Sequence, residues 1–295
     1  MESGNMVKNE AISENTSSNK IGYHFSSQVT VKFNPQQESL WVHWNPQPRP
    51  CFNLELLESI QAYGNFLQKH KGKIFDAGEE YSLKYTITLS DNPKAFNLGG
   101  DLELFIDAIE NGEYLKLLEY GKKCIEVVYK NYIAYGLPLT TIALVQGLCL
   151  GGGFEAALGH HILIAEKTAR FGFPEISFNL FPGMGAYSLL ERRLGQRLAD
   201  QLISSGKRYT AQEMFDLGVV DVLVEDGTGY NAVNELISQR QAHQYGLQGI
   251  SEIRRLTQKL EYNELESIVE VWAKRAMHIT NQDLKLMKRL ARWQG

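Results

Sequence analysis

The chain has 295 residues, of which 43% are hydrophobic and 22% are charged, a composition that predicts an ordinary globular protein with a large core. Its formal net charge of −4 gives no reason to expect attraction to nucleic acid or to an anionic membrane. The three cysteines, Cys51, Cys124 and Cys149, include no CxxC pair, which favours reduced thiols in a cytoplasmic protein over a disulfide framework or a zinc site.

The N-terminal segment is polar and rich in Asn, Ser and Glu, without an apolar stretch. We therefore expect neither a signal peptide nor a membrane anchor, and we expect residues 1–26 to form a disordered tail. The most apolar region, 142–165, is interrupted by Glu155, His160, His161 and several glycines, so membrane insertion is not expected.

Two runs, 27–33 and 39–45, alternate apolar and polar residues around a short turn and predict a β-hairpin. Helical spacing follows over 52–70. A strand-forming run over 81–90 and a long helical region over 102–131 come next. The N-terminal third thus contains both strands and helices.

The segment 140–147 is nearly continuously apolar, as is typical of a strand buried on both faces, and another strand is expected over 161–166. Strands with intervening helices predict an α/β core over 27–228. Beyond Gly229, three helical segments predict a helical C-terminal subdomain over 229–295.

Three consecutive glycines, Gly151–Gly153, follow the apolar strand, and Glu155 lies directly behind them. Glycines between a strand and a helix let backbone N–H groups approach a ligand, which favours an anion site or an oxyanion hole. Tight helix packing beside a surface carboxylate is the structural alternative. A dinucleotide fingerprint is disfavoured, because GxGxxG does not follow the first strand and no acid is placed for a ribose contact.

A second acid, Glu175, lies further along the chain. Its neighbours are aromatic or apolar: Phe171, Phe173, Pro174, Ile176 and Phe178. A carboxylate in such surroundings loses solvation, so its pKa should rise toward a value useful for proton transfer near neutral pH. Together with Glu155 and a cluster of backbone donors, it would supply proton transfer beside a polarised carbonyl.

Three motifs carry a family resemblance: KAFNLGGDL over 94–102, GLCLGGGFEAAL over 147–158, and FGFPEISFNLFPGMGAYSLLERRLG over 171–195. In combination they resemble the crotonase superfamily, the enoyl-CoA hydratase/isomerase fold, over 27–290. Residues 48–57 also resemble the first strand-to-helix junction of that family.

The resemblance implies an α/β fold in which repeated ββα units form a spiral core and C-terminal helices mediate a homotrimer or a dimer of trimers. It implies that the N–H groups of Gly100 and Gly152 hold a thioester carbonyl, and that Glu155 and Glu175 do the acid/base work. It implies no metal and no cofactor beyond the acyl carrier protein or CoA that carries the substrate. The stripe within 264–276 is expected to pack against a neighbouring subunit.

Within the superfamily, four features most resemble the diffusible signal factor synthases: the hairpin-bearing N-terminal extension, PRPCFNL, FNLGGDL and the aromatic run over 171–188. This resemblance implies dehydration of a 3-hydroxyacyl chain on acyl carrier protein, followed by thioester cleavage to a cis-2-unsaturated free fatty acid signal. It allows a cognate signal-sensor protein as a further partner.

Two other functions stay open. An ordinary acyl-CoA hydratase or isomerase would leave the thioester intact, and a non-catalytic scaffold would use the fold to bind a partner protein. Retention of both Glu155 and Glu175 argues against the scaffold.

Several residues have a structural alternative. His160 and His161 would lie on opposite faces of a strand and lack a third metal ligand, so structural roles are expected. Asp101 would either orient the first oxyanion loop or cap a helix. The segment 288–294 would dock an acidic carrier, end as a solvated helix or contact a neighbouring subunit. Five side chains would either pack in the core or line an acyl tunnel: Phe171, Phe173, Phe178, Phe181 and Met184.

Overall fold

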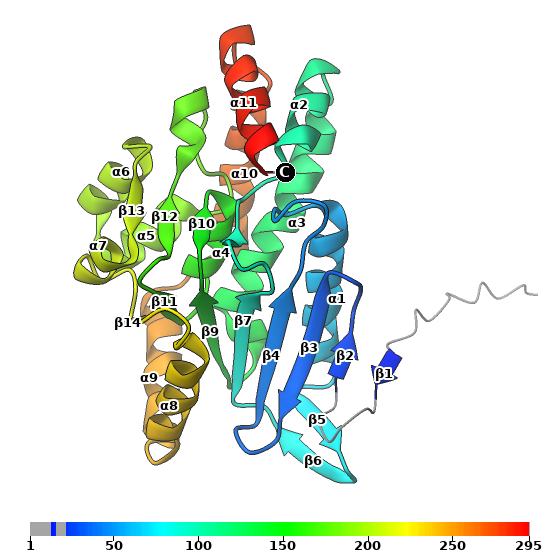
Figure 1. Cartoon of the computed structure of the whole chain (residues 1–295), viewed down its shortest axis with the longest axis vertical. Coiled ribbons are helices and arrows are strands. Elements are labelled where there is room, and N and C mark those ends of the chain that lie inside the picture. The colour runs from blue at the N-terminus through cyan, green and yellow to red at the C-terminus, as the bar shows by residue number, and fades with distance from the viewer. Residues whose placement is uncertain (1–12, 16–21, 295) are drawn as a thin grey trace, which may run out of the picture.

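The computed structural model describes residues 13–15 and 22–294, and its largest element is an eight-stranded mixed sheet (Figure 1). In spatial order its strands are β1 (Ser13–Asn15), β2 (Gly22–His24), β3 (Val29–Asn34), β4 (Ser39–Trp44), β7 (Tyr85–Ser90), β9 (Thr140–Val145), β11 (Ile162–Glu166) and β14 (Val222–Val224). Strands β1 to β4 pair antiparallel, and the pairs from β4 onward are parallel.

A second, four-stranded sheet lies at the carboxyl ends of the parallel strands. In spatial order it contains β13 (Arg208–Thr210), β12 (Arg170–Gly172), β10 (Leu148–Leu150) and β8 (Ala95–Asn97). A separate hairpin pairs β5 (Lys73–Asp76) with β6 (Glu79–Ser82).

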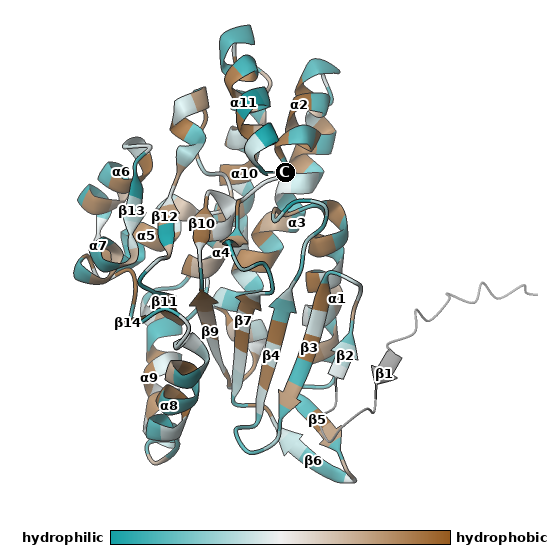
Figure 2. Ribbon diagram, in the orientation of Figure 1, coloured by the Kyte–Doolittle hydropathy of each residue, from teal (hydrophilic) through white to brown (hydrophobic). Residues whose placement is uncertain are grey.

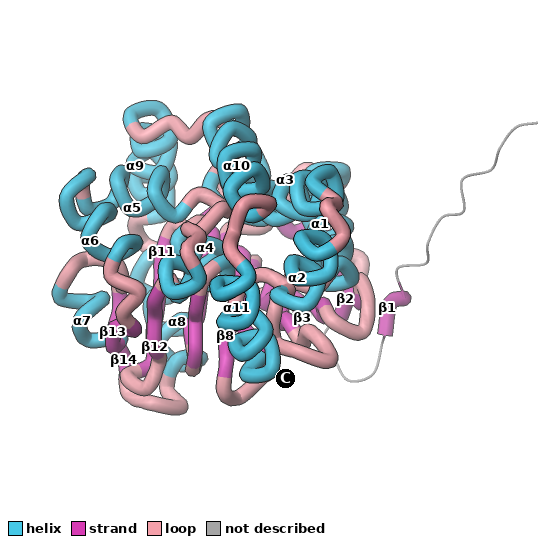
Figure 3. Tube along the Cα trace, turned by 90° about the horizontal axis from the view of Figure 1, so that it is seen from above, coloured by secondary structure: helices cyan, strands magenta, loops and turns pink. Residues whose placement is uncertain are grey.

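Helices cover both sheets (Figure 3). The α-helices are α1 (Leu54–Lys69), α2 (Leu102–Glu110), α3 (Tyr114–Tyr132), α4 (Gly152–Leu158), α5 (Ala186–Leu194), α6 (Gln196–Ser204), α7 (Ala211–Asp216), α8 (Gly229–Gln241), α9 (Gln244–Thr257), α10 (Tyr262–Ala276) and α11 (Asn281–Gln294). Two short 3₁₀ turns are η1 (Ala134–Gly136) and η2 (Pro174–Phe178).

One pattern recurs along the chain: a strand of the large sheet, a short strand of the small sheet, and then a helix. Strands β7 and β8 precede α2, β9 and β10 precede α4, and β11 and β12 precede η2 and α5. This repetition is a spiral of ββα units, so the expected α/β fold class is confirmed.

The predicted hairpin and first helix are present. Strands β3 and β4 pair from Val29 opposite Trp44 to Asn34 opposite Ser39. Helix α1 begins after Asn53, whose side chain accepts a hydrogen bond from the N–H of Leu56 at 2.8 Å. Such an N-cap satisfies one of the free donors at a helix start, which explains why the helix begins there.

Strand β9 is buried on both faces, as its apolar sequence predicts. Ala143 and Val145 belong to the main core. Ile142 and Leu144 point the other way, into a second core that Val233 of α8 closes. In Figure 2 the arrow of β9 is brown, whereas β4 and β7 also carry white and teal segments.

The expected disordered tail over 1–26 is wrong for residues 22–26. Strand β2 pairs with β3 and so adds a third strand to the hairpin. Tyr23 is buried and its ring lies 5.1 Å from that of Phe66 on α1. Strand β1 pairs with β2 in turn, and the remainder of the tail lies outside the described residues.

The C-terminal part contains four helices, α8 to α11, where three segments are expected. The connection between α8 and α9 is only Ala242 and His243, and neither Gly nor Pro marks it in the sequence. The expected boundary at 228/229 coincides with the start of α8.

The apolar stripe of 264–276 is covered by the chain itself and not by a neighbouring subunit. Helix α10 packs along α3, where a Cβ on Gly121 would lie only 2.5 Å from Val269. The buried residues of the stripe are Leu265, Val269, Trp272, Ala273 and Ala276. Helix α11 lies beside α2 (Figures 1 and 3) and also contacts η2. Both helices therefore complete the core of their own chain.

Helix α9 is the C-terminal helix that keeps an open apolar face, because none of its residues is buried. Its exposed apolar side chains are Tyr245, Ile250, Ile253 and Leu256. None of the described helices is both long enough and apolar enough to cross a membrane.

We expect the chain to sediment as a trimer or a dimer of trimers, as the resemblance implies, with α9 in the contact because its apolar face lacks cover. Ile253→Asp and Leu256→Asp should then shift sedimentation velocity toward smaller species. Leu115→Asp, which changes an exposed leucine on α3, is the matched control and should leave the assembly unchanged. A wild-type monomer at micromolar concentration would contradict the expected assembly.

Candidate active site

A cavity of about 510 Å³ opens where the small sheet meets the C-terminal helices. Its walls come from the loop between β8 and α2, the start of α4, η2, and helices α3, α10 and α11. These elements are far apart in the sequence, and the spiral of ββα units brings them together.

Two backbone N–H groups on the cavity wall are free to bind a ligand. Gly152 is the first residue of α4, so its N–H has no acceptor within the helix. Neither it nor the N–H of Gly100 donates to another atom of the described residues. A Cβ built on Gly152 would lie 3.6 Å from the nitrogen of Gly100, so the two residues that carry the free donors lie close together on the cavity wall. Paired backbone donors of this kind are what an oxyanion hole requires.

At each glycine of the run Gly151–Gly153, an added Cβ would lie so close to another group that something would have to move. A Cβ on Gly151 would lie 2.4 Å from Oε1 of Glu175, and its φ of +52° is rarely adopted by L-residues. A Cβ on Gly152 would lie 2.5 Å from the sulfur of Met184. On Gly153 it would lie 2.2 Å from the carbonyl oxygen of Asn97. The alternative of simple helix packing is therefore insufficient, since two of the three glycines face the cavity lining.

Glu155 lies on α4 and is 1% exposed. Its Oε1 accepts hydrogen bonds from the N–H groups of Met184 and Ala186 at 2.7 and 2.8 Å. Burial raises its pKa to about 8, and the nearby Glu175 carboxyl adds to this rise, while the backbone hydrogen bonds oppose it. Glu155 is therefore fixed in position and holds its proton near neutral pH.

Glu175 lies on η2, and its carboxyl group faces the same cavity. Its Oε2 is shielded from solvent and has no hydrogen-bond partner among the described residues. Burial raises the pKa of Glu175 to about 7. Two carboxyls with raised pKa values that line one cavity can act as a proton donor and a proton acceptor near neutral pH.

The structure brings six of the predicted site residues to the cavity wall: Gly100, Gly152, Glu155, Glu175, Phe178 and Met184. The other three predicted acyl-pocket residues do not line it. Phe171 and Phe173, two apart around β12, both pack on Phe154 of α4, with ring centroids 5.1 and 4.8 Å apart. Phe181 is partly buried against the main core. The expectation of a tunnel is thus wrong for Phe171, Phe173 and Phe181.

Sequence reasoning missed the residues that the C-terminal helices contribute. Trp272 of α10 and three residues of α11, Leu290, Trp293 and Gln294, line the cavity. Part of the segment 288–294 therefore lines the cavity, while Trp293 itself is 85% exposed. The stripe in 264–276 signalled burial, but nothing in its spacing indicated a cavity.

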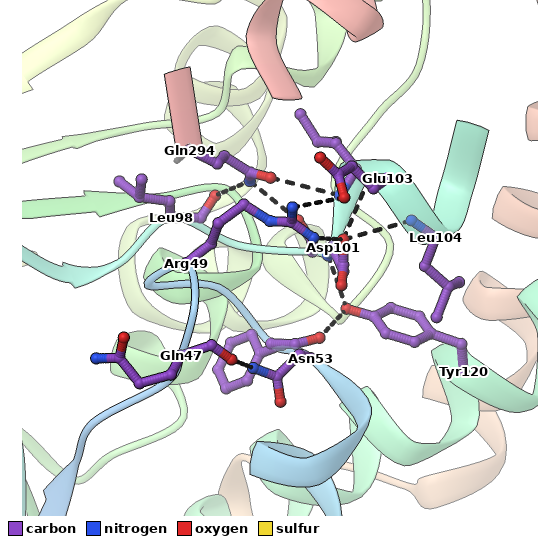
Figure 4. Close-up of polar contacts among 12 residues, drawn as sticks. Gln47, Arg49, Asn53, Leu98, Asp101, Glu103, Leu104, Tyr120 and Gln294 are labelled. Carbon is purple, nitrogen blue, oxygen red and sulfur yellow. Dashed lines mark hydrogen bonds and ion pairs between the residues drawn. The ribbon is translucent and has the colours of Figure 1, made fainter. Parts of the chain in front are cut away.

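Asp101 caps α2: its Oδ1 accepts hydrogen bonds from the N–H groups of Glu103 and Leu104 and pairs with Arg49 at 3.1 Å (Figure 4). Its backbone N–H donates to the hydroxyl of Tyr120. Both expected roles are therefore combined, because the cap fixes the end of the loop that carries Gly100.

The adjacent histidines have structural partners. The ring of His160 bridges Ala156 O and Thr88 Oγ1 at 2.8 and 2.9 Å, and His161 contacts Tyr132 O at 3.1 Å. Burial lowers the pKa of each to about 4, so both are neutral. Within residues 13–15 and 22–294, no group of three or more His, Cys, Asp or Glu is placed to hold a metal ion.

The spiral of ββα units and a cavity that joins two free N–H groups with two buried carboxyls define a crotonase-type enzyme. The chain belongs to the enoyl-CoA hydratase/isomerase family, whose model matches residues 76–262.

Curated relatives agree with this assignment. An enoyl-CoA isomerase/hydratase of Mycosarcoma maydis is 30% identical over 195 residues, which cover 66% of this chain and 68% of the relative. A probable enoyl-CoA hydratase of Bacillus subtilis is 31% identical over 141 residues, 48% of this chain and 52% of that protein. The match thus spans only about half of the second relative.

Solved structures show the same fold. An enoyl-CoA hydratase from Bacillus halodurans superposes with a TM-score of 0.70 at 20% identity, over 89% of this chain and 100% of that one. DspI from Pseudomonas aeruginosa superposes with a TM-score of 0.65 at 21% identity, over 85% of this chain and 87% of that one.

The buried carboxyls make stability depend on pH. Because the folded chain retains a proton on Glu175 that the unfolded chain releases, the free energy of unfolding should fall as the pH rises from the ordinary glutamate pKa of 4.5 to the folded pKa of about 7, and it should level off above that pH. Glu175→Gln removes this titration, so the variant should be more stable than wild type at about pH 8, by roughly 1–3 kcal/mol, and equally stable at about pH 4.

Denaturant unfolding measures the free energy of unfolding of each variant. Glu213→Gln is a control for which the opposite change in stability is expected. The Glu213 carboxyl is exposed, and its pKa is lowered to about 2 by Lys207 and by the capping hydrogen bonds of Thr210. The ionised Glu213 carboxylate stabilises the folded chain at neutral pH, so the Glu213→Gln variant should be less stable than wild type at that pH. A Glu175→Gln variant whose stability follows the wild-type pH curve would show that Glu175 is not a buried acid.

Proposed function

We propose that the chain dehydrates 3-hydroxyacyl thioesters and then cleaves the thioester, releasing a cis-2-unsaturated free fatty acid of the diffusible signal factor type. The observation that carries the proposal is the pair of carboxyls, Glu155 and Glu175, in one cavity with the free N–H groups of Gly100 and Gly152. The motif resemblance adds the substrate class and the second step.

Dehydration needs three things at one point: an acceptor for the α proton, a donor for the leaving hydroxyl, and stabilisation of negative charge on the carbonyl oxygen. The two N–H donors bind the carbonyl oxygen as it gains enolate character. One glutamate takes the α proton and the other protonates the hydroxyl, which departs as water, leaving the 2-enoyl thioester. Carboxyls with pKa values of about 8 and 7 suit this exchange at neutral pH.

Thioester cleavage uses the same donors. When a glutamate activates water to attack the carbonyl carbon, the carbonyl oxygen becomes a tetrahedral oxyanion at the position that the enolate oxygen occupied. Collapse of this intermediate expels the carrier thiol and yields the free acid. One oxyanion hole therefore serves both steps.

The carrier is expected to be anionic, whether acyl carrier protein or CoA. Arg208 lines the cavity. Arg289 and Arg292 lie on α11, the helix that also carries the cavity-lining Trp293. These cations would attract an acidic carrier surface or the phosphates of CoA.

The alternative is a hydratase or isomerase that leaves the thioester intact, and the similarity to an enoyl-CoA isomerase/hydratase and to a probable enoyl-CoA hydratase favours it. The two functions differ in their products. We expect mass spectrometry to detect the free 2-unsaturated acid from 3-hydroxydodecanoyl carrier thioesters. An enoyl thioester that accumulates without free acid would establish the alternative.

Glu155→Gln and Glu175→Gln preserve side-chain shape but remove proton transfer, so each should lower the dehydration rate by about 10²-fold or more. Glu191→Gln, an outward-facing change on α5, serves as the control and should leave the rate unchanged. Circular dichroism checks the fold of each variant. Near-wild-type turnover by either site variant would remove that residue from the proposed mechanism.

Gly152→Pro tests the shared oxyanion hole, because proline lacks the N–H group. Both dehydration and thioester cleavage should fall together, by about 10²- to 10³-fold. Proline is tolerated at the first position of a helix, but its ring crowds Met184. Gly152→Ala adds the same crowding and keeps the N–H, so it is the matched control and should lose much less activity.

The assay supplies 3-hydroxyacyl and cis-2-enoyl carrier thioesters separately to each folded variant. If Gly152→Pro stopped dehydration but hydrolysed the enoyl thioester at the wild-type rate, cleavage would take place elsewhere and the single-site mechanism would be wrong.

A further inference from the structure

The loop that presents the first oxyanion donor is fixed by hydrogen bonds to its neighbouring peptide groups. The N–H of Gly99 donates to Oδ1 of Asn97 at 2.7 Å. The carbonyl of Gly99 accepts from the N–H of Phe52 at 2.8 Å. The N–H of Asp101 donates to the hydroxyl of Tyr120 at 3.0 Å. Residues from β8, from the segment before α1 and from α3 thus hold this loop in place.

The remaining contacts come from Gln294, on the last turn of α11 (Figure 4). Its Nε2 donates to the carbonyl of Gly100 at 3.0 Å and to that of Leu98 at 3.3 Å. Its Oε1 accepts from the N–H of Leu102 at 3.4 Å.

Three successive peptide groups, which join residues 98 to 101, contain six polar groups. The contacts above satisfy five of them, and within the described residues only the N–H of Gly100 stays free. Buried peptide groups that lack a partner are costly, so a loop with this pattern has few alternative conformations. Gln294 holds the peptide groups on both sides of the free donor.

Gln294 is itself firmly placed. The side chain is 8% exposed, and Met287 and Ala291 bury the face of α11 that packs on the core. Lys288 pairs with Glu110 of α2 at 2.5 Å, which ties the helix to the element that follows the loop.

We propose that Gln294 is a positioning residue that aligns the Gly100 N–H with the substrate carbonyl. Its amide acts through the loop and does not need to touch the reacting atoms. Leu290 and Trp293 of the same helix line the cavity, so an acyl chain that packs against them also settles Gln294 on the loop. The kinetic part of this inference rests on the proposed function, and the link from helix to loop does not.

Gln294→Met keeps the length of the side chain but removes both donors and the acceptor. Hydrogen exchange over residues 97–102, followed by mass spectrometry, should become faster than in wild type. With a 3-hydroxyacyl thioester, kcat for dehydration should fall about tenfold while KM changes less than about twofold. The reason is that a misaligned donor should lower the rate by less than a missing donor does.

Two further variants separate positioning from helix docking. Gln294→Glu keeps the acceptor for Leu102 but cannot donate, so it should show the same loss in kcat. Glu110→Gln weakens the ion pair with Lys288 and leaves the loop contacts in place, so both exchange and kinetics should match wild type.

Exchange over 97–102 that is unchanged in Gln294→Met would overturn the proposal, as would faster exchange with wild-type kcat. A rise in KM alone would also overturn it, because that result would assign Gln294 to binding. If wild type failed to dehydrate any 3-hydroxyacyl thioester, the proposed function would fail, and the exchange comparison would still decide whether Gln294 fixes the loop.

Discussion

The site depends on one close approach of backbone to backbone, between the loop after β8 and the glycine run before α4. A Cβ on Gly99 would lie 2.9 Å from the nitrogen of Gly152, and one on Gly153 would lie 2.2 Å from the carbonyl of Asn97. Only glycine permits this distance. Because no side chain intervenes, two N–H groups without partners, from different ββα units, lie close together on the cavity wall, and the position of Glu155 three residues later follows from the same turn.

The two carboxyls show that this arrangement is not optimised for stability. Glu155 receives two backbone hydrogen bonds, but Glu175 leaves an oxygen without a partner among the described residues, and burial raises the pKa of both. Burial of an unpaired acid is costly unless it stays protonated. An interior that had only to be stable would place apolar side chains there, so these acids are best explained by proton transfer.

The parts of the site that could be predicted are those set by local sequence: the glycine run, the two acids among apolar neighbours, and the cap at Asp101. The sequence left Phe171 and Phe173 between core packing and an acyl tunnel, and only tertiary structure places both rings against Phe154. The stripe of α10 indicated burial, but the neighbouring subunit expected to cover it was the wrong partner, because α3 of the same chain packs against it. Periodicity specifies which face is covered, and the covering element is decided by tertiary packing.

The packing of helices α10 and α11 on the rest of the chain has a consequence for function. They supply Trp272, Leu290 and Trp293 to the cavity of their own chain. The apolar face of α9, in contrast, has no cover within the described residues. Contacts between copies through α9 would therefore affect the stability of the protein. The catalytic rate would instead depend on how α11 packs on α2 and η2. Stability and catalytic rate would be separable because they depend on different helices.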